Sequence, residues 1–502
     1  MASAGSGVVI DIDLLDQQWS SIDLLDQQWL SSLRKRVAGT GLRSRPREEP
    51  RTICRVPLHL REGDPVAYEP RIISFGPFCR DNPAVKPMEE LKLRYVRRLL
   101  RRNPNAALED YVNLIRGLEV RLRACYSEDI AMDSNKFVEM MLLDGCFFVE
   151  LLLMISSGHC HGYEEEEEEA DPVLTTPWAL ILINFDMLML ENQIPFFIID
   201  GVFKLATFRR SCPGSLTDLL LRFFDALLPC ERTSSPPPED TFYHVLHFVH
   251  SRIVHFESKH EITMVKPPAA PIYLVLRQIR RRLSNIYGRV ASSARGFWPP
   301  TRVRNEPSGS SPLTPESVPC ATMLKEAGVK FREKKAESFL EVAFHDDGTM
   351  EIPKLLLYDG TNSLFRNLIA FEQCFPKAGT DVATYAVFMD CLVDSGEDVA
   401  LLHRRGCLMN GLGDDEEAAR LFNRLCKGVV VDYDSCYLAS LFKDVKKHCD
   451  TRWYKYRARL MRDYFSNPWA FLSLLGALII IHLTVVQTSF AILAYFNPLP
   501  TS

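Results

Sequence analysis

Residues 469–496 read WAFLSLLGALIIIHLTVVQTSFAILAYF, a run of 28 residues without a single Asp, Glu, Lys or Arg. A helix that rises about 1.5 Å per residue needs roughly 20 apolar residues to cross a hydrocarbon core of about 30 Å. Pro468 is typical of a helix start, and Trp469 and Tyr495 are aromatic residues of the kind found at membrane interfaces. The run therefore predicts one transmembrane helix, followed by a short far-side tail, 497–502. A buried core helix is the alternative, although such helices are usually shorter.

Basic residues gather on only one side of this run. Residues 497–502 carry none, whereas five precede the run: Arg452, Lys455, Arg457, Arg459 and Arg462. Because excess Lys and Arg remain on the cytoplasmic side of a membrane, we expect a single-pass protein with a cytosolic N-terminal body, and the plasma membrane as its location. Residues 1–9 lack the basic start and apolar core of a secretory signal, which agrees with this orientation.

The composition argues against several classes of protein. The formal net charge is −5 and the pI is near 6.2, so nothing predicts nucleic-acid binding. The 14 cysteines are scattered and include no Cys-x-x-Cys pair, which is typical of reduced thiols in a cytosolic body and not of a disulfide framework. The expected partners are therefore the lipid bilayer and proteins that the sequence does not identify.

The first 51 residues contain an internal duplication. The octapeptide IDLLDQQW at 12–19 recurs at 22–29. A repeat of ten residues leaves the two copies about 80° apart on a helix, so they would not share one face. We interpret residues 1–51 as a mobile segment that tolerates a tandem duplication; a docking helix is the alternative.

Residues 52–465 predict one body that is mainly α with minor β (α+β). Four prolines between residues 54 and 78 make its start extended and rich in turns. Helical periodicity then dominates, and it predicts helices at 88–102, 105–127, 135–156, 177–191 and 198–208.

Later parts of the body are less uniform. Residues 338–344 and 350–357, joined by a turn at 346–348, predict a hairpin. The Pro/Ser-rich residues 292–319 predict a flexible excursion, which leaves two packed lobes as a possible arrangement. Six consecutive glutamates at 164–169 predict a solvated loop. Helices are expected to resume from residue 363.

The body carries no signature of an enzyme or of a cofactor site. Phosphate-binding, dinucleotide-binding, nucleophile-elbow and His-Glu-x-x-His motifs are all absent from the sequence. His244, His247 and His250 have a spacing that could bring imidazoles together on zinc, but no carboxylate completes the set. We therefore expect neither a metal nor a cofactor, and interpret the three histidines as buried side chains.

Polar side chains interrupt two apolar segments. Asp144 lies within an apolar stretch of the helix predicted at 135–156, and Glu191, Asn192 and Gln193 end another such stretch just before Pro195. One hypothesis is a carboxylate pair that performs acid–base chemistry. The other, which we favour, is that these groups satisfy helix ends and fix the register between helices.

The same segments belong to a series of spaced motifs that runs in order from about residue 52 to 496. They read VP at 56–57, AYEP at 67–70, SFGP at 74–77, ME at 88–89, KLRY at 92–95, FVEMMLLDGC at 137–146, LENQIPFF at 190–197, LKEAGV at 324–329, FRNLIAFEQC at 365–374, NGLG at 410–413, LFN at 421–423 and YFSNPW at 464–469. With these motifs the chain closely resembles the plant family called domain of unknown function 247. One departure is Cys79, which follows Phe78 where the family often has a histidine.

The resemblance implies a plant-specific, membrane-anchored protein without an established enzymatic activity. Some grass members of the family are associated with the pollen side of self-incompatibility. Glu372, in the motif at 365–374, joins the four polar residues above as a structural candidate. The expectation is thus a membrane-tethered recognition or signalling component, with an enzyme or a structural membrane scaffold as alternatives. A concave pocket with convergent ionisable groups would favour the enzyme, and a flat apolar patch would favour a binding module.

Overall fold

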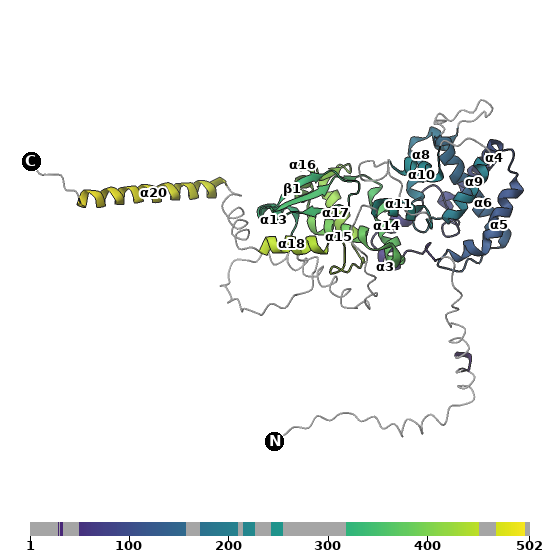
Figure 1. Ribbon diagram of the computed structural model, residues 1–502, viewed down its shortest axis with the longest axis horizontal. Coiled ribbons are helices and arrows are strands. Elements are labelled where there is room, and N and C mark those ends of the chain that lie inside the picture. Colours follow the sequence, from purple (N-terminus) through teal and green to yellow (C-terminus); the bar gives the residue numbers. More distant parts are fainter. Residues whose placement is uncertain are drawn as a thin grey trace, which may run out of the picture. The chain divides into compact units, whose positions relative to one another are not determined.

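The computed structural model shown in Figure 1 describes residues 29, 31–33, 50–156, 171–208, 214–225, 242–254, 318–450 and 468–496. The chain divides into two compact units, Met1–Pro50 and Arg51–Ser502, and nearly all described residues belong to the second. The predictions for residues 12–28, 164–169 and 497–502, and that for 292–319 up to residue 317, fall outside the described residues.

Helix α6 (Ser134–Ser156) is the centre of the first half of the body. Every residue from Met140 to Met154 is buried, as expected of a helix that is apolar on all sides. It packs against four helices: α4 (Pro87–Arg102), α5 (Leu108–Ala124), α9 (Phe196–Thr207) and α10 (Leu216–Phe224). Gly145 permits the close approach of α9, because a Cβ at this position would lie 3.2 Å from a methyl carbon of Ile198.

The second half is built around α14 (Thr361–Cys374), whose residues from Ser363 to Glu372 are all buried. It packs against α15 (Asp381–Leu392) and α17 (Asp415–Leu425).

The other helices of the body belong to both halves. They are α3 (Leu58–Arg61), η1 (Pro65–Tyr68), η2 (Pro83–Val85), α7 (Pro172–Thr175), α8 (Pro177–Asp186), α11 (Val245–Val254), α13 (Ala321–Glu326), η6 (Pro376–Ala378), α16 (Gly396–Arg404) and α18 (Ala439–Asp450).

Two small sheets lie in the second half. Strand β3 (Thr349–Pro353) pairs in parallel with β1 (Lys330–Lys334) and antiparallel with β2 (Ala343–Phe344). Strand β4 (Leu355–Leu357) pairs in parallel with β5 (Leu408–Asn410). The predicted hairpin is therefore confirmed only as the short β2–β3 pair. It was wrong to extend it to residue 357, because that end pairs with a strand about fifty residues further along the chain, which local patterning does not reveal.

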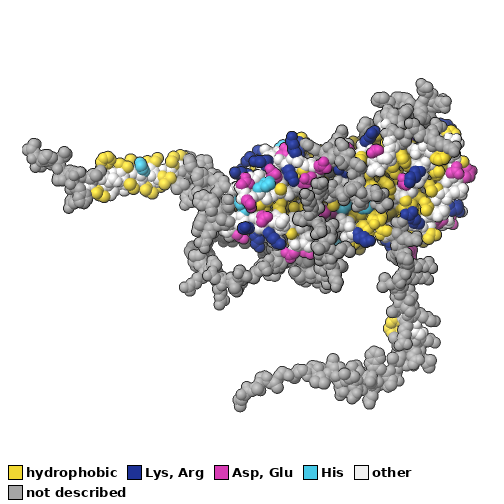
Figure 2. Space-filling model, in the orientation of Figure 1, with side chains coloured by type: hydrophobic (Ala, Val, Ile, Leu, Met, Phe, Trp, Pro, Cys, Tyr) yellow, Lys and Arg dark blue, Asp and Glu magenta, His cyan; other side chains and the backbone are white. Residues whose placement is uncertain are grey.

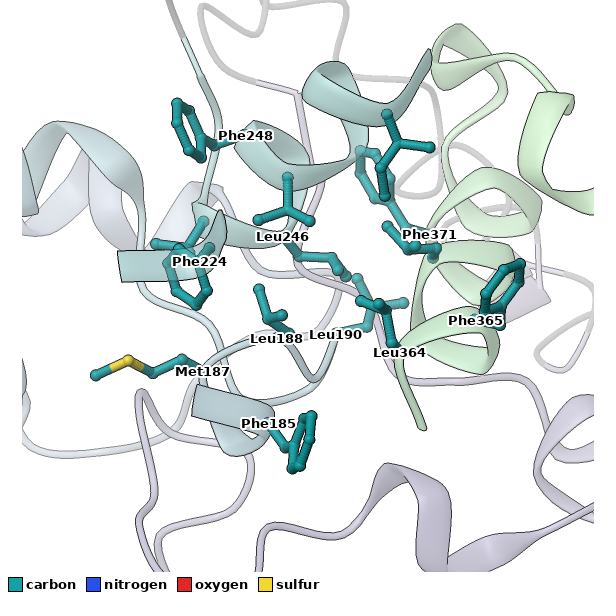
Figure 3. Close-up of a cluster of buried hydrophobic side chains, with 14 of the residues drawn as sticks. Phe185, Met187, Leu188, Leu190, Phe224, Leu246, Phe248, Leu364, Phe365 and Phe371 are labelled. Carbon is teal, nitrogen blue, oxygen red and sulfur yellow. The ribbon is translucent and has the colours of Figure 1, made fainter. Parts of the chain in front are cut away.

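One hydrophobic core joins both halves. Figure 3 shows Phe185, Met187, Leu188 and Leu190 from the end of α8 and the following turn beside side chains of α10, α11 and α14. The amide of Leu190 also donates to Asn367 Oδ1 of α14 at 2.9 Å. The turn after α8 thus contacts both halves, so the side chains in it are well placed to fix their packing.

The helix predictions hold for most of the first half. Helices α4, α5, α6 and α9 confirm the predictions at 88–102, 105–127, 135–156 and 198–208, with ends that differ by a few residues. The helix predicted at 177–191 is wrong in its last turn, because α8 ends at Asp186. The side chain of Asp186 binds backbone amides of a distant segment, and the chain then turns up to Pro195. The mainly helical fold with minor β structure is confirmed.

Helix α20 (Pro468–Phe496) covers the apolar run, and Trp469 and Tyr495 fall at its two ends. Its described side chains are exposed and mostly apolar (Figure 2). The longest continuous stretch of described side chains in α20 is 475–490. Over the described residues, no helix meets the length and apolarity needed to cross a bilayer.

Candidate functional site

The irregular segment Arg71–Gly76 is held by side chains from α6, from the end of α8 and from the turn after it. Its first three amides donate to the carboxylate of Asp186 at 2.7–2.9 Å. Its fifth amide donates to Asn192 Oδ1 at 2.7 Å, and its sixth to Asp144 Oδ2 at 2.7 Å. We call this segment and the three side chains the polar hub. Because a buried backbone amide costs free energy when it is unpaired, the hub replaces the hydrogen bonds that secondary structure would otherwise supply.

The predicted residues Asn192 and Gln193 use both ends of their amide groups. Asn192 Nδ2 donates to the carbonyls of Ile73 and Asp186 at 3.0 and 2.9 Å. Gln193 Nε2 donates to two carbonyls in the turn after α8, at 2.7 and 2.8 Å, and its Oε1 accepts from the amide of Leu246 at 3.1 Å. No amide group of either side chain is left over to contact a ligand.

Asp144 faces a fully buried lysine. Lys92 Nζ donates to Asp144 Oδ1 at 2.7 Å, to the carbonyl of Ser74 at 2.6 Å and to Glu89 at 2.6 Å. All three ammonium protons therefore have an acceptor, as a buried charge requires. Burial raises the pKa of Asp144, and the neighbouring ammonium of Lys92 opposes the rise. Burial likewise raises the pKa of Asp186 to about 6, while its three amide donors oppose the rise.

Glu191 points to the other side of the turn. It is only 4% exposed, and its Oε1 accepts from Arg61 and from the amide of Val56, both at 2.6 Å. Its Oε2 accepts from Arg55 at 3.1 Å. The carboxylate thus ties the start of the body to the turn after α8.

Glu372 belongs to a separate cluster. Its carboxylate accepts from the first amides of α15, those of Val382 and Ala383, at 2.9 and 2.8 Å. Its Oε1 also lies 2.9 Å from Nε2 of the buried His250. Negative charge at a helix N-terminus is favourable, so Glu372 closes the end of α15 across the turn that follows α14.

The three histidines line one side of Phe371. The ring centroids of His244, His247 and His250 lie 5.1–5.6 Å from that of Phe371. Burial lowers the pKa of His247 to about 4 and lowers that of His244 well below its usual value. Over the described residues, no three His, Cys, Asp or Glu side chains are arranged to hold a metal ion.

Helix α15 buries hydroxyl groups in a different way from the hub. Thr384 and Tyr385 are about 1% exposed or less, and neither Thr384 Oγ1 nor Tyr385 Oη finds a hydrogen-bond partner among the described residues. Tyr126 provides the contrast near the hub, because its equally buried hydroxyl donates to the carbonyl of Gln193 at 3.0 Å.

An open cavity of about 600 Å³ lies beside Glu191. Arg55 and Arg61 line it, and their guanidinium groups lie over the rings of Phe78 and Tyr68 at 4.2 and 5.6 Å from the ring centroids. Cys79 also lines it; burial raises the pKa of this thiol to about 12, so it is protonated at neutral pH and a poor nucleophile. Arg55 and Arg61 converge on Glu191 and pair with it, and Asp81 also lines the cavity.

Sequence reasoning identified part of this arrangement. The structure brings Asp144 and Asn192 together in the hub, with Gln193 in the adjoining turn, and places Glu191 at the cavity and Glu372 elsewhere. Asp186 and Lys92 were missed. Lys92 had a signal, because it falls on the apolar face of its helix with Tyr95 and Leu99, where a lysine needs a buried partner.

A model of the plant family DUF247, described as a plant protein of unknown function, matches residues 53–483. A UPF0481 protein of Arabidopsis thaliana is 28% identical over 458 residues, which cover 89% of this chain and 87% of that protein. A second UPF0481 protein of the same plant is 26% identical over 489 residues, which cover 87% and 89%. No solved structure gives a significant match.

Proposed function

The chain belongs to the DUF247 family of plant proteins of unknown function, and on that premise we propose that it is a membrane-tethered recognition or signalling component. In this proposal α20 crosses the bilayer, the body faces the cytosol, and the cavity beside Glu191 receives part of a partner. The body performs no catalysis.

The hydrogen bonds made by hydroxyl groups within α20 are the observation that supports the membrane tether. Thr484, Thr488 and Ser489 each donate to the carbonyl four residues earlier, at 2.7–2.8 Å. A hydrocarbon core offers no hydrogen-bond partner, so polar groups in a span must be satisfied within the helix. The apolar side chains around them are exposed, as in Ile480 and Phe490 at 65% and 68%. Water would be a poor environment for such a surface, and lipid a good one.

The cavity supports recognition more than chemistry. Its two arginines are bound to Glu191 and its thiol is protonated, so these three groups supply neither a free base nor an activated nucleophile. Its rim includes Leu58, which is 77% exposed. An exposed apolar side chain beside paired charges is typical of a protein-binding surface.

An enzyme is the second candidate, and the cavity is the observation that favours it. Arg55, Arg61 and Glu191 do converge on one hollow, and a substrate that carries its own anion could displace Glu191 from the arginines. Asp81, which also lines the cavity, would be the candidate base for such chemistry.

The tether is tested with the full chain expressed in plant cells. Ile480→Arg places a charge at the middle of the run, which should cost about 2.5–3.5 kcal/mol of insertion free energy. The protein should then shift from alkali-resistant membranes to the extractable fraction, whereas Ile480→Leu should not. Equal resistance of both variants, or extraction of the unaltered protein, would count against the tether.

Recognition at the cavity is tested by proximity labelling of the same full chain. Leu58→Asp adds a charge on the rim, and Val120→Asp adds the same charge at a residue of α5 that is 87% exposed and does not line the cavity. Partners should be lost from the first variant only. If both variants keep every partner, or lose the same ones, the cavity is not the recognition surface. Release of a chemically altered small molecule, abolished by Arg61→Ala, would favour the enzyme.

A further inference from the structure

The charges that line the cavity beside Glu191 do not balance. The charged side chains among its lining residues are Arg55, Arg61, Glu69, Asp81 and Glu191. The other side chains that line it are uncharged at neutral pH, so the cavity carries one negative charge in excess. Because walls of low dielectric constant concentrate the field of such a charge, the cavity favours a cation over an anion.

The two arginines are committed to a buried carboxylate. Arg61 and Arg55 bind Glu191 at 2.6 and 3.1 Å, and Glu191 is only 4% exposed. An anion that displaced Glu191 from them would leave a buried charge without its counter-charges, which is strongly unfavourable. A cation that binds elsewhere in the cavity does not meet this cost.

The carboxylates at the rim are more accessible than Glu191. Asp81 is exposed, and no described residue forms a hydrogen bond or an ion pair with its side chain. Glu69 is 60% exposed, and its ion pair with Arg61 is a loose one at 4.0 Å. Both side chains can therefore accept from a bound cation without loss of a strong interaction within the body.

The backbone on both sides of Asp81 is fixed. Cys79 Sγ donates to the carbonyl of Glu191 at 3.6 Å, and the amide of Asn82 donates to the carbonyl of Cys79 at 3.2 Å. Asn82 Oδ1 in turn accepts from the amide of Ala84 at 3.0 Å and caps η2. Asp81 thus belongs to a turn that is already ordered, so little conformational entropy is lost when its backbone takes part in binding.

The same cavity offers apolar surface. Leu58, the first residue of α3, is 77% exposed, and Val56, Pro70 and Pro83 also line the cavity. A Lys or Arg side chain suits this combination, because its apolar stem packs on such a surface while its charged head reaches a carboxylate. Over the described residues, no three acidic, His or Cys side chains are arranged to hold a metal ion. The lining therefore favours a basic side chain over an inorganic cation.

We propose that the cavity beside Glu191 binds a basic segment of a partner protein, in which a Lys or Arg side chain pairs with Asp81 and Glu69 and a neighbouring apolar side chain packs on Leu58. The inference rests on the proposed recognition function and specifies the chemistry of the partner at that site. Because the charged contact lies at the exposed rim, the affinity for such a segment should fall as the salt concentration rises.

The test selects random peptides, displayed on phage, on the purified full chain in detergent micelles. Peptides with Lys or Arg beside an apolar residue should be enriched. When these peptides are synthesised and measured by fluorescence anisotropy, Asp81→Asn should weaken their binding about tenfold, through loss of one charge-assisted hydrogen bond. The matched control is Asp346→Asn, which removes an exposed carboxylate outside the cavity lining and should leave the affinity unchanged.

The outcomes distinguish this inference from the function on which it rests. If the enriched peptides are acidic or uncharged and Leu58→Asp abolishes their binding, the cavity is a recognition surface but its partner is not basic. Equal affinity of basic peptides for Asp81→Asn and for the unaltered chain would also overturn the inference, because Asp81 would not receive the cation. If no peptide is enriched, or if neither Asp81→Asn nor Leu58→Asp changes binding, both the inference and recognition at the cavity are wrong.

Discussion

The polar hub and helix α15 bury polar groups to a similar extent but treat them differently. In the hub, Asp144, Asp186 and Asn192 accept from five backbone amides. In α15, the hydroxyls of Thr384 and Tyr385 have no partner among the described residues. A buried polar group that loses its partner costs free energy, whereas removal of a group that has none relieves it. Burial alone therefore does not identify the polar residues on which the fold depends; their hydrogen bonds do.

The largest effect is expected at the charge pair of the hub. Asp144→Asn leaves the ammonium of Lys92, which is 0% exposed, without its buried counter-charge, and should lower the free energy of unfolding by about 3–5 kcal/mol. Denaturant titration of the full chain in micelles, followed by circular dichroism, measures the loss. The control is Asp200→Asn, which breaks the exposed pair with Lys204 and should cost at most about 1 kcal/mol. Similar losses in both variants would remove the contrast between hub and surface.

The next effect concerns hydrogen bonds without charge. Asn192→Ala unpairs one amide and two carbonyls of the hub, and should cost about 3 kcal/mol in the same titration. Gln373→Ala removes two hydrogen bonds to Val430 at an exposed position, where water replaces them, so we expect less than about 1 kcal/mol. If Asn192→Ala is fully stable yet loses partner binding in cells, the residue belongs to a binding site and not to the structural hub.

A moderate loss of stability on acidification is expected from the histidines, and it is opposed by buried carboxyls with a raised pKa such as Asp186. The pKa of His247 is about 4 in the folded protein and near 6.5 when unfolded, so the unfolded chain binds more protons between these values. Stability from this group is complete above pH 6.5 and falls as the pH drops, by about 2 kcal/mol from pH 7.5 to pH 5.

The comparison variant is His247→Gln, whose side-chain oxygen can still accept the hydrogen bond from the amide of Tyr243. Its unfolding free energy should depend less steeply on pH over the same interval. Parallel curves for the two proteins would show that His247 does not titrate with unfolding, and would assign acid sensitivity to other groups such as His244.

The smallest effect is expected in α15. Tyr385→Phe removes a hydroxyl that has no partner among the described residues, so stability should not fall and should rise slightly, by about 0.5 kcal/mol. Tyr126→Phe removes a hydroxyl of equal burial that donates to Gln193, and should cost about 1–2 kcal/mol. A large loss in Tyr385→Phe would mean that its hydroxyl is bonded after all, and the contrast between the two regions would fail.

Sequence patterns were sufficient where structure is local. The helical periodicity of residues 135–156 predicted α6, and the helix predicted at 198–208 is found as α9, two residues earlier at its start. They were insufficient where the chain is held by distant residues. Asp186 ends α8 because it binds amides more than a hundred positions away, and β4 pairs with a strand that no local signal connects to it.

The candidate residues show the same division. Polar side chains inside apolar segments pointed to Asp144 and Asn192, but not to the backbone segment that they hold, because unbonded amides leave no trace in composition. Glu191 lies apart from Asn192 because its carboxylate binds Arg55 and Arg61, which come from the turn-rich start of the body. That pairing depends on the three-dimensional arrangement, and no spacing rule connects the three residues.

The polar hub also limits how early this part of the chain can fold during synthesis. Phe75 donates to Asn192, a residue that the ribosome adds 117 positions later. At about 5–20 residues per second, the nascent chain waits roughly 6–23 s before its acceptor is even synthesised. Throughout this interval the amide of Phe75 lacks its acceptor and α6 lacks the cover of α9, so this part of the body cannot complete its fold before translation passes residue 192.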